Sequence, residues 1–371
     1  MKTASRQETD HGARLRAAGQ APTGDVLPAP HSGRWPLLLL VLLAAVFAAL
    51  VAGTLIGPTE VSWGAVRASF WRLVTLRLSL DGPPEEIIIL FLRMPRVLLA
   101  GLVGASLAVA GVIMQALFRN PMAEAGIIGV TSGGAFFGIL SLRLGLAAAT
   151  VWALPASAFA GAFAVAFSIY LLAGGGRRES MYLLLLIGLA FNSIFSSLIA
   201  LVLTTTPNYE LARQMQFWML GGLEGRSWEH VWLLAPFAFT GIIICRLHVR
   251  TLNVLLLSDD SAASLGLNVE RVRAELLTVA AMLAGGAVAV SGTIAFVGLI
   301  VPHICRLIAG ANHRHVVPAS VLLGASFLIV SDILARSLFT TTELRLGIVT
   351  SLIGGPFFIH LLLSSSRQFR R

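Results

Sequence analysis

Long apolar stretches without Asp, Glu, Lys or Arg recur along the whole chain and restrict its fold more than any other feature. The first covers residues 36–56 and the last residues 346–363. About 20 apolar residues in a helix cross the hydrocarbon core of a bilayer once. Only helices and closed barrels satisfy their backbone inside a membrane, and these stretches lack the alternation of strands. The sequence therefore predicts an all-α polytopic membrane protein.

The composition agrees with this class of fold. Hydrophobic residues make up 56% of the chain and charged residues 12%, against about 25% in an average protein. The formal net charge of +9 comes from residues scattered through the loops, so it does not indicate nucleic-acid binding. Cys245 and Cys305 both lie in apolar stretches, which supports neither a disulfide framework nor a zinc site.

We expect ten transmembrane helices in one domain, residues 35–371, after a disordered cytoplasmic tail, residues 1–34. An even number of spans puts both termini on one side, and a cytoplasmic location places most of the 27 Lys and Arg there. Between the first two spans, residues 57–86 carry Trp63 and Trp71 and read as an interfacial amphipathic segment. The predicted spans are residues 36–56, 96–117, 126–142, 151–173, 182–203, 231–247, 272–290, 292–309, 317–334 and 346–363.

Two of these spans resemble each other. Residues 104–111 (GASLAVAG) parallel residues 285–292 (GGAVAVSG), and Pro121 and Pro302 follow at the same distance. The expected topology runs the two segments in opposite directions, which is typical of inverted repeats in transporters. Chance similarity between two helices rich in Ala and Gly is the alternative.

Several motifs together resemble a known family. They are RMPR at residues 93–96, NPMA at 120–123, GVTSGG at 129–134, GTIAFVGLIVPHICRLIAG at 292–310 and ELRLGIVTSLIGGP at 343–356. In this order they resemble the FecCD-type permeases of type II ABC importers, which move iron-siderophores, haem and cobalamin. The resemblance runs from about residue 35 to 363. Arg345 stands where this family usually has proline, a change that adds a positive charge at the outer side.

The resemblance implies that Arg93, Arg96 and Arg336 dock glutamates of a periplasmic substrate-binding protein. Charge pairs of this kind steer encounter and fix the register of a complex. Taken without the resemblance, arginines at a membrane interface often only anchor a helix. Asp332, one turn before Arg336, is suited to hold that arginine in place.

The longest cytoplasmic loop contains a predicted short helix. Ser258 and the aspartates after it suit a helix N-terminus, and Gly266 suits its end. The resemblance implies that this segment is the coupling helix that contacts the ATPase subunit, and an ordinary capped surface helix is the alternative. Its residues are Ser258, Asp259, Asp260, Ser261, Ala262, Ala263, Ser264, Leu265, Gly266 and Leu267.

A cytoplasmic gate is implied at two further turns, with the residues Asn120, Met122, Met181 and Tyr182. Asn120 and Pro121 also form a common turn opener on their own. Gln115 and Asn192 lie inside spans, where polar side chains more often join helices than line a path.

The chain has no GxxxxGK[ST] motif, so ATP and Mg²⁺ are expected on a separate ATPase subunit, and this chain is expected to bind no cofactor or metal. An ion-coupled secondary carrier, the alternative energy source, usually needs acidic residues buried in its spans. The sequence puts the acidic residues Glu124, Glu179, Glu210 and Glu343 in turns and Asp332 near the end of a span, which argues against an ion-coupled carrier. The side and spacing of His303, His313, His315 and His360 suit structural roles better than a shared metal site.

The expected protein is thus a multi-pass permease of the bacterial inner membrane. Its expected partners are a second copy of itself, two ATPase subunits, a periplasmic binding protein and membrane lipid, but no nucleic acid. Residues 217–223 (FWMLGGL) and Trp228 favour haem as the substrate. Ferric siderophores and cobalamin remain alternatives, and a membrane-embedded enzyme would need a catalytic cluster that the spans do not contain.

Overall fold

The computed structural model describes residues 34–75, 81–126, 128–174, 180–338 and 343–368, and within these ranges it contains helices and no strands. Of the predicted tail, residues 1–33 lie outside the described residues, so the domain boundary stays a prediction. In chain order the helices are α2 (Trp35–Leu55), α3 (Trp63–Val74), α4 (Pro84–Ile87), the π-helical η1 (Ile88–Arg93), α5 (Met94–Leu117), α6 (Val130–Arg143), α7 (Leu146–Ala149), α8 (Ala153–Leu172), α9 (Ser180–Thr204), α10 (Tyr209–Met219), α11 (Trp228–Leu247), α12 (Val249–Leu255), α13 (Asp259–Ser264), α14 (Val269–Ser291), α15 (Val297–Ala309), α16 (His313–Ser337) and α17 (Leu346–Gln368). Helices α4, η1 and α5 follow one another without a break and form one continuous helix.

The all-α membrane fold is confirmed, but the count of ten spans is not. Among the described residues, eight helices are long and apolar enough to cross a membrane: α2, the continuous helix Pro84–Leu117, α8, α9, α11, α14, α16 and α17. The third and eighth predicted spans are the shorter helices α6, of 14 residues, and α15, of 13. Both helices begin after a residue in the left-handed conformation, Gly129 (φ 76°) and Phe296 (φ 70°), which interrupts the helical hydrogen bonds.

The continuous helix Pro84–Leu117 forms the centre of the bundle, and 83% of its most apolar part is buried. Glycines let two neighbours approach it closely. A methyl group on Gly104 would lie 2.1 Å from the Gly324 carbonyl oxygen of α16, and one on Gly111 would lie 1.9 Å from that of Gly298 in α15. No side chain larger than hydrogen fits at these crossings.

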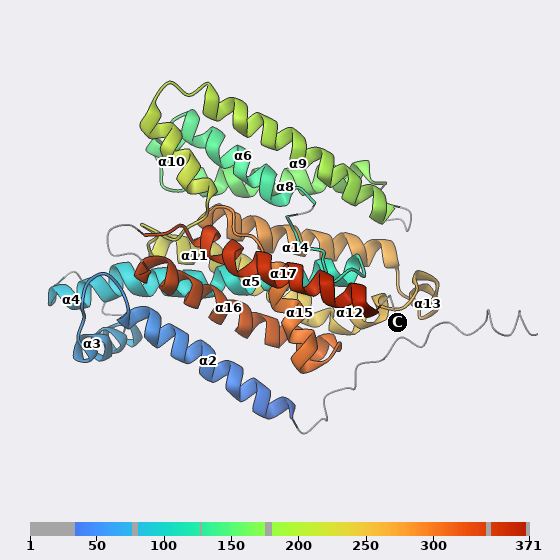
Figure 1. Ribbon diagram of the computed structural model, residues 1–371, viewed down its shortest axis with the longest axis horizontal. Helices are drawn as coiled ribbons and strands as arrows, with labels where there is room; N and C mark the ends of the chain where they lie inside the picture. The colour runs from blue at the N-terminus through green and yellow to red at the C-terminus, as the bar shows by residue number, and fades with distance from the viewer. Residues whose placement is uncertain (1–33, 76–80, 127, 175–179, 339–342, 369–371) are drawn as a thin grey trace, which may run out of the picture.

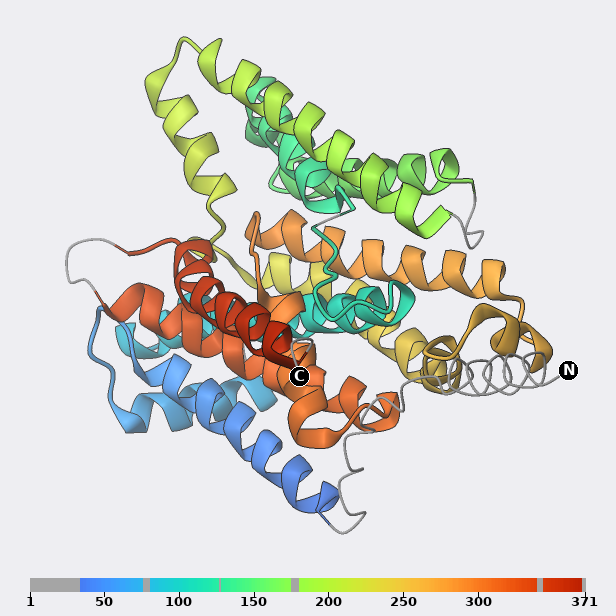
Figure 2. The same ribbon diagram turned by 45° about the vertical axis from the view of Figure 1, so that its right-hand side comes forward.

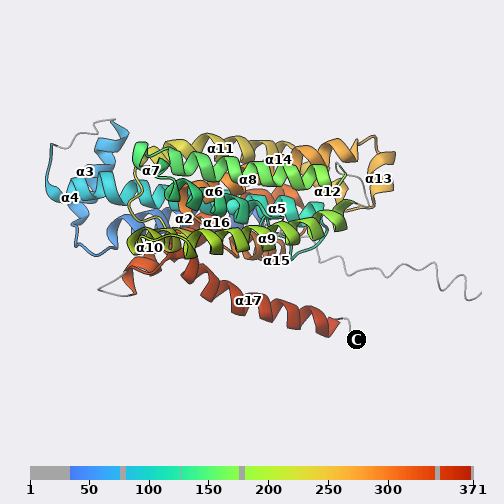
Figure 3. The ribbon, with the colours of Figure 1, turned by 90° about the horizontal axis from the view of Figure 1, so that it is seen from above.

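The helices are arranged in groups around this centre. Figures 1 and 2 show α6, α8 and α9 together on one side of α5 and α14, with α2 on the opposite side. Figure 3 shows that α17 lies along a third face, away from α8 and α11. The described ends of the chain, at α2 and α17, both lie at the end of the bundle that carries α13 (Figure 1). We call this the α13 end, and the opposite one the α3–α4 end.

Helix α3 lies within the segment that the sequence predicts to be interfacial. Ser62 caps its N-terminus by accepting a hydrogen bond from the Ala65 N–H. Trp63 and Trp71 are 61% and 67% exposed, as expected for aromatic side chains at the level of lipid headgroups.

The two similar segments occupy matching places in the fold. Each lies in a long buried helix, α5 or α14, that is followed by a break and a short helix, α6 or α15. Arg119 after α5 and Arg273 at the start of α14 both contact Asp259, so the two long helices run in opposite directions. This geometry agrees with an inverted repeat.

Candidate functional site

At the α3–α4 end, Arg93 and Arg336 turn into the protein rather than out of it. Arg93 Nη1 donates to the carbonyl oxygens of Thr54 (2.9 Å) and Leu55 (2.6 Å), and Nη2 donates to Thr59. Arg336 Nη2 donates to the Gly53 carbonyl. The last turn of α2 leaves these carbonyls without helical partners, and its dipole favours cations there. Both arginines therefore fix α2, and they are only 5% and 4% exposed.

Arg96 joins three elements at the same end. Its guanidinium contacts Asp332 on α16 (3.0 Å) and Glu343 before α17 (2.9 Å). Asp332 also lies 3.5 Å from Arg336 Nε, which supports the expected role of that aspartate in holding Arg336. The Arg96 side chain is 13% exposed and that of Glu343 is 29% exposed. Arg96 is thus the most accessible of the three predicted docking residues, and its Glu343 partner is the one that an incoming carboxylate could replace.

At the α13 end, the segment 258–267 has the local structure that its sequence predicts. Ser258 accepts a hydrogen bond from the Ser261 N–H (3.0 Å), and Gly266 follows the helix at φ 82°. Leu256, Leu257 and Leu265 are 42%, 53% and 65% exposed around it. An exposed apolar patch beside a short capped helix is typical of a protein contact.

Asp259 fastens α13 to the core. It accepts two 2.9 Å hydrogen bonds from Arg273 on α14 and one of 2.5 Å from Arg119, which also donates to the Leu255 carbonyl. Burial alone would raise the pKa of this carboxyl, but the hydrogen bonds and charges of the two arginines outweigh it and lower the pKa. Asp259 therefore stays ionised, and it links α13 to the turn that follows α5.

That turn contains half of the predicted gate. The Asn120 side chain accepts a hydrogen bond from the Met122 N–H (2.9 Å), so the turn chemistry is present. Asn120 is exposed and Met122 half-buried. The side chains of Met181 and Tyr182 lie outside the described residues, and the gate stays a prediction.

A cavity of about 490 Å³ is lined by residues of α5, α6, α9, α14 and α15. Both helix breaks open onto it, and α9 and α14 supply further walls. Its polar lining consists of Glu124, Thr131, Ser132, Asn192, Ser196 and Thr293. Asn192 joins helices, as expected, because it accepts from Ser132 Oγ (2.6 Å) and donates to the Gly126 carbonyl (3.2 Å), but it also lines the cavity.

Glu124 is the residue that the sequence analysis missed. It lies in a turn, as the sequence predicts, but it also lines the cavity and accepts a hydrogen bond from the backbone N–H of Phe296, the residue before α15. The break after α5 and the break before α15 therefore meet at this carboxylate. The sequence does contain a signal for this site. The two repeats are each interrupted at the same place, and interrupted helices at matching places of a repeat form binding sites in transporters.

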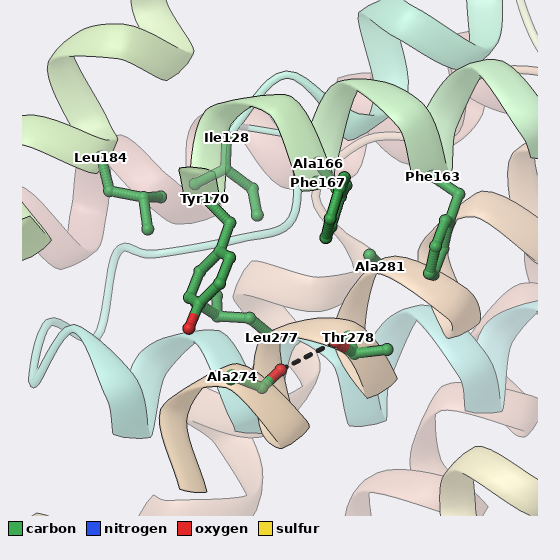
Figure 4. A pocket seen from close by; sticks show the side chains of 10 residues that line it. All are labelled: Ile128, Phe163, Ala166, Phe167, Tyr170, Leu184, Ala274, Leu277, Thr278 and Ala281. Carbon is green, nitrogen blue, oxygen red and sulfur yellow. Dashed lines mark hydrogen bonds between the residues drawn. The ribbon is translucent and has the colours of Figure 1, made fainter. Parts of the chain in front are cut away.

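A second hollow is too small for transport. Figure 4 shows Phe163, Phe167 and Tyr170 beside Ala274 and Thr278, whose hydroxyl donates to the Ala274 carbonyl. Its volume of about 30 Å³ is that of a single water molecule.

The residues that favoured haem have other partners. Arg345 Nη1 lies 2.5 Å from Glu224, and its guanidinium lies 4.4 Å from the centre of the Phe217 ring. Trp228 Nε1 donates to the Leu90 carbonyl (2.8 Å). These contacts connect α10 and the loop after it to the segment before α17, and α11 to the helix Pro84–Leu117, at the α3–α4 end.

The histidines are dispersed. Within the described ranges no group of three or more His, Cys, Asp or Glu could hold a metal ion. His313 is fully buried with its ring 2.8 Å from Asn253, and His315 stacks on Trp35 at 4.4 Å.

Comparisons with known proteins agree on one class. The profile of the FecCD transport family matches residues 37–364. The hemin transport system permease protein of Yersinia pestis is 39% identical over 75% of this chain and 83% of its own length. The vitamin B12 import system permease protein of Escherichia coli is 39% identical over 77% and 86%. A solved metal-chelate type ABC transporter, in an inward-facing conformation, has a TM-score of 0.78 at 30% identity and covers 89% of this chain and all of its own.

Proposed function

This chain belongs to the FecCD transport family and is a permease subunit of an ABC importer, and we propose that it moves haem or another iron chelate from a periplasmic binding protein to the cytoplasm. It is a transport component rather than an enzyme. The observation that carries the proposal is the family match over residues 37–364, together with the cavity between the repeats. A ferric siderophore or cobalamin is the alternative cargo, and relatives named for each transport are similarly close.

The proposed assembly contains two copies of this chain, two ATPase subunits and one binding protein, in the bacterial inner membrane with both termini in the cytoplasm. The α13 end then faces the cytoplasm, which agrees with the exposed leucines around α13 as a contact for the ATPase. ATP and Mg²⁺ belong to that subunit. This chain binds no cofactor of its own in the proposal.

Docking is proposed at the α3–α4 end on the arginine cluster. Arg96 would contact a carboxylate of the binding protein in exchange for Glu343, while Arg93 and Arg336 hold α2 and keep the cluster in place. The gate is proposed at Asn120, Met122, Met181 and Tyr182, where movement of α13 would arrive through Asp259 and Arg119.

The test is uptake into proteoliposomes that contain this permease and its ATPase, with a binding protein loaded in turn with haem, a ferric trihydroxamate and cobalamin. We expect one loaded form to stimulate ATP hydrolysis and to accumulate inside. The control is the same complex with the ATPase's phosphate-loop lysine replaced, which should abolish accumulation. Accumulation without any ATPase would contradict the proposal and favour an ion-coupled carrier.

A further inference from the structure

The large cavity has an unbalanced charge. Glu124 is the charged residue among those that line it, and no Arg or Lys in the described ranges forms an ion pair with its carboxylate. The other polar groups are hydroxyls and an amide. A wall of this kind offers hydrogen-bond acceptors to whatever enters, and a negative charge when the Glu124 carboxyl is ionised.

The carboxylate is held in a fixed place. The backbone N–H of Phe296 donates to it, and the N-terminus of α15 directs the positive end of its dipole toward it. Burial raises the pKa of the Glu124 carboxyl, and the hydrogen bond from the Phe296 N–H opposes this shift without reversing it. A cationic group of a ligand beside the carboxyl would favour its ionised form, because an opposite charge lowers the pKa of a carboxyl.

The carboxylate also faces open space. A methyl group built on Gly126 would lie 3.5 Å from Glu124 Oε1 and 3.6 Å from Thr131 Oγ1, so both oxygens border the same volume. Both residues line the cavity together with Ser196, which is exposed. A ligand group beside Gly126 could contact the carboxylate and the hydroxyl at once.

We propose that this cavity is a selectivity subsite in which Glu124 binds an ammonium or N–H-bearing group of the transported chelate. The proposal rests on the importer function proposed above and narrows its cargo to cationic or amide-rich chelates. Of the cargoes proposed above, it favours the ferric siderophore and cobalamin alternatives over haem, because an ionised Glu124 would repel the two propionates of haem in a site of low dielectric constant.

The charge of the cavity can be measured without any substrate. Ser196→Cys places a thiol on the cavity wall, and the native Cys245 and Cys305 are buried, so the unaltered chain is the blank. The assembled complex is treated with an ammonium-bearing and a sulfonate-bearing methanethiosulfonate of similar size. Each rate is divided by the rate of the same reagent with a small free thiol.

We expect the normalised rate of the cationic reagent to exceed that of the anionic one by about tenfold at low salt, because fixed charges concentrate counter-ions in clefts. Glu124→Gln should reduce this ratio to about one, whereas Glu124→Asp, which keeps the charge, should preserve it. A ratio of one or less in the Ser196→Cys chain, or a ratio that Glu124→Gln leaves unchanged, would overturn the proposal.

A series of chelates then tests the cargo. A linear iron(III) trihydroxamate with a terminal ammonium is compared with its N-acetyl and N-succinyl derivatives, which are neutral and anionic at that end. We expect the highest kcat/KM for the ammonium form and a smaller spread in Glu124→Gln. Glu229→Gln, an exposed carboxylate outside the cavity, is the matched control.

The outcomes separate the two proposals. Equal uptake of the three forms would overturn the subsite and leave the importer function standing. No ATP-driven uptake of any chelate would count against the importer function, while the reagent ratio would still report the charge of the cavity. Uptake that requires Na⁺ at constant ionic strength would assign the carboxylate to an inorganic cation and would also overturn the subsite.

Discussion

Arg93 and Arg336 show how much the surroundings decide the role of a single residue. In the sequence they are two cations beside apolar spans, equally suited to docking and to anchoring. In the structure their guanidinium groups occupy the C-terminal turn of α2, where four backbone carbonyls have no partner within the helix. Arg96, three residues after Arg93, instead pairs with carboxylates and keeps some exposure. Neighbouring arginines of one motif thus have different tasks.

Arg93→Met is expected to destabilise the protein, because it removes the donors to Thr54 and Leu55 but keeps the apolar stem. Hydrogen bonds from a charged group contribute about 1.5–3 kcal/mol each, so we expect the free energy of unfolding to fall by at least about 1.5 kcal/mol. Thermal unfolding in detergent measures it. Arg67→Met, at an exposed position of α3, is the control, and equal Tm values for the two variants would contradict this role.

Among the elements, α13 depends on its neighbours for its position. Six residues are too few for a stable isolated helix, and its caps only define where it begins and ends. Asp259 and the two arginines attach it to α14 and to the turn after α5. The same turn leads within five residues to Glu124 on the cavity wall. A displacement of α13 by the ATPase would therefore be transmitted toward the cavity through Arg119.

Arg119→Gln should uncouple transport from ATP hydrolysis, since it breaks the ion pair with Asp259. We expect at least about fivefold less chelate moved per ATP, at the low end of typical coupling energies. Arg271→Gln, whose side chain is 77% exposed, is the control. A normal ratio of transport to hydrolysis in Arg119→Gln would contradict the role of this link.

The ion pair also predicts a pH dependence. The folded pKa of Asp259 lies below its ordinary value of 3.8, so its stabilisation is complete above that value and is lost as pH falls through the lowered pKa. The amount of chelate moved per ATP should therefore not change with the protonation of Asp259 between about pH 5 and 8. A pH midpoint for the chelate moved per ATP in that range, if it disappeared in Asp259→Asn, would contradict the conclusion that Asp259 stays ionised.

At the scale of the whole molecule, the exposed faces of α9 and α17 are the candidates for contact with a second copy of the chain. Only 17% and 22% of the most apolar parts of these two helices are buried. Asn192, Ser196 and Ile199 of α9 line the large cavity, while Gly354 of α17 packs against Phe296. Helix α2 is equally exposed but lies on the opposite side of the bundle (Figure 1). In the proposed dimer, α9 and α17 are therefore the faces that meet the second copy.

Leu352→Cys, on the exposed face of α17, is expected to form disulfide-linked dimers under mild oxidation in membranes. Phe47→Cys on α2 has a similar exposure, 70% against 68%, and should stay monomeric because it faces lipid. Band positions on non-reducing gels report the result. Cross-linking through Phe47→Cys and not through Leu352→Cys would place the dimer interface on α2 and would contradict this assignment.

The sequence by itself determined the helical membrane fold, the caps of α13 and the exposed tryptophans of α3. These features depend on local composition and on residues a few positions apart, which a chain displays directly. Only the tertiary structure decided which spans are shortened, where Arg93 and Arg336 point, and that Glu124 lines a cavity. Each of these depends on contacts between residues far apart in the chain, such as Gly111 with Gly298 and Glu124 with Phe296. A left-handed residue such as Phe296 is stable only when the surrounding packing fixes it, and no local pattern announces it.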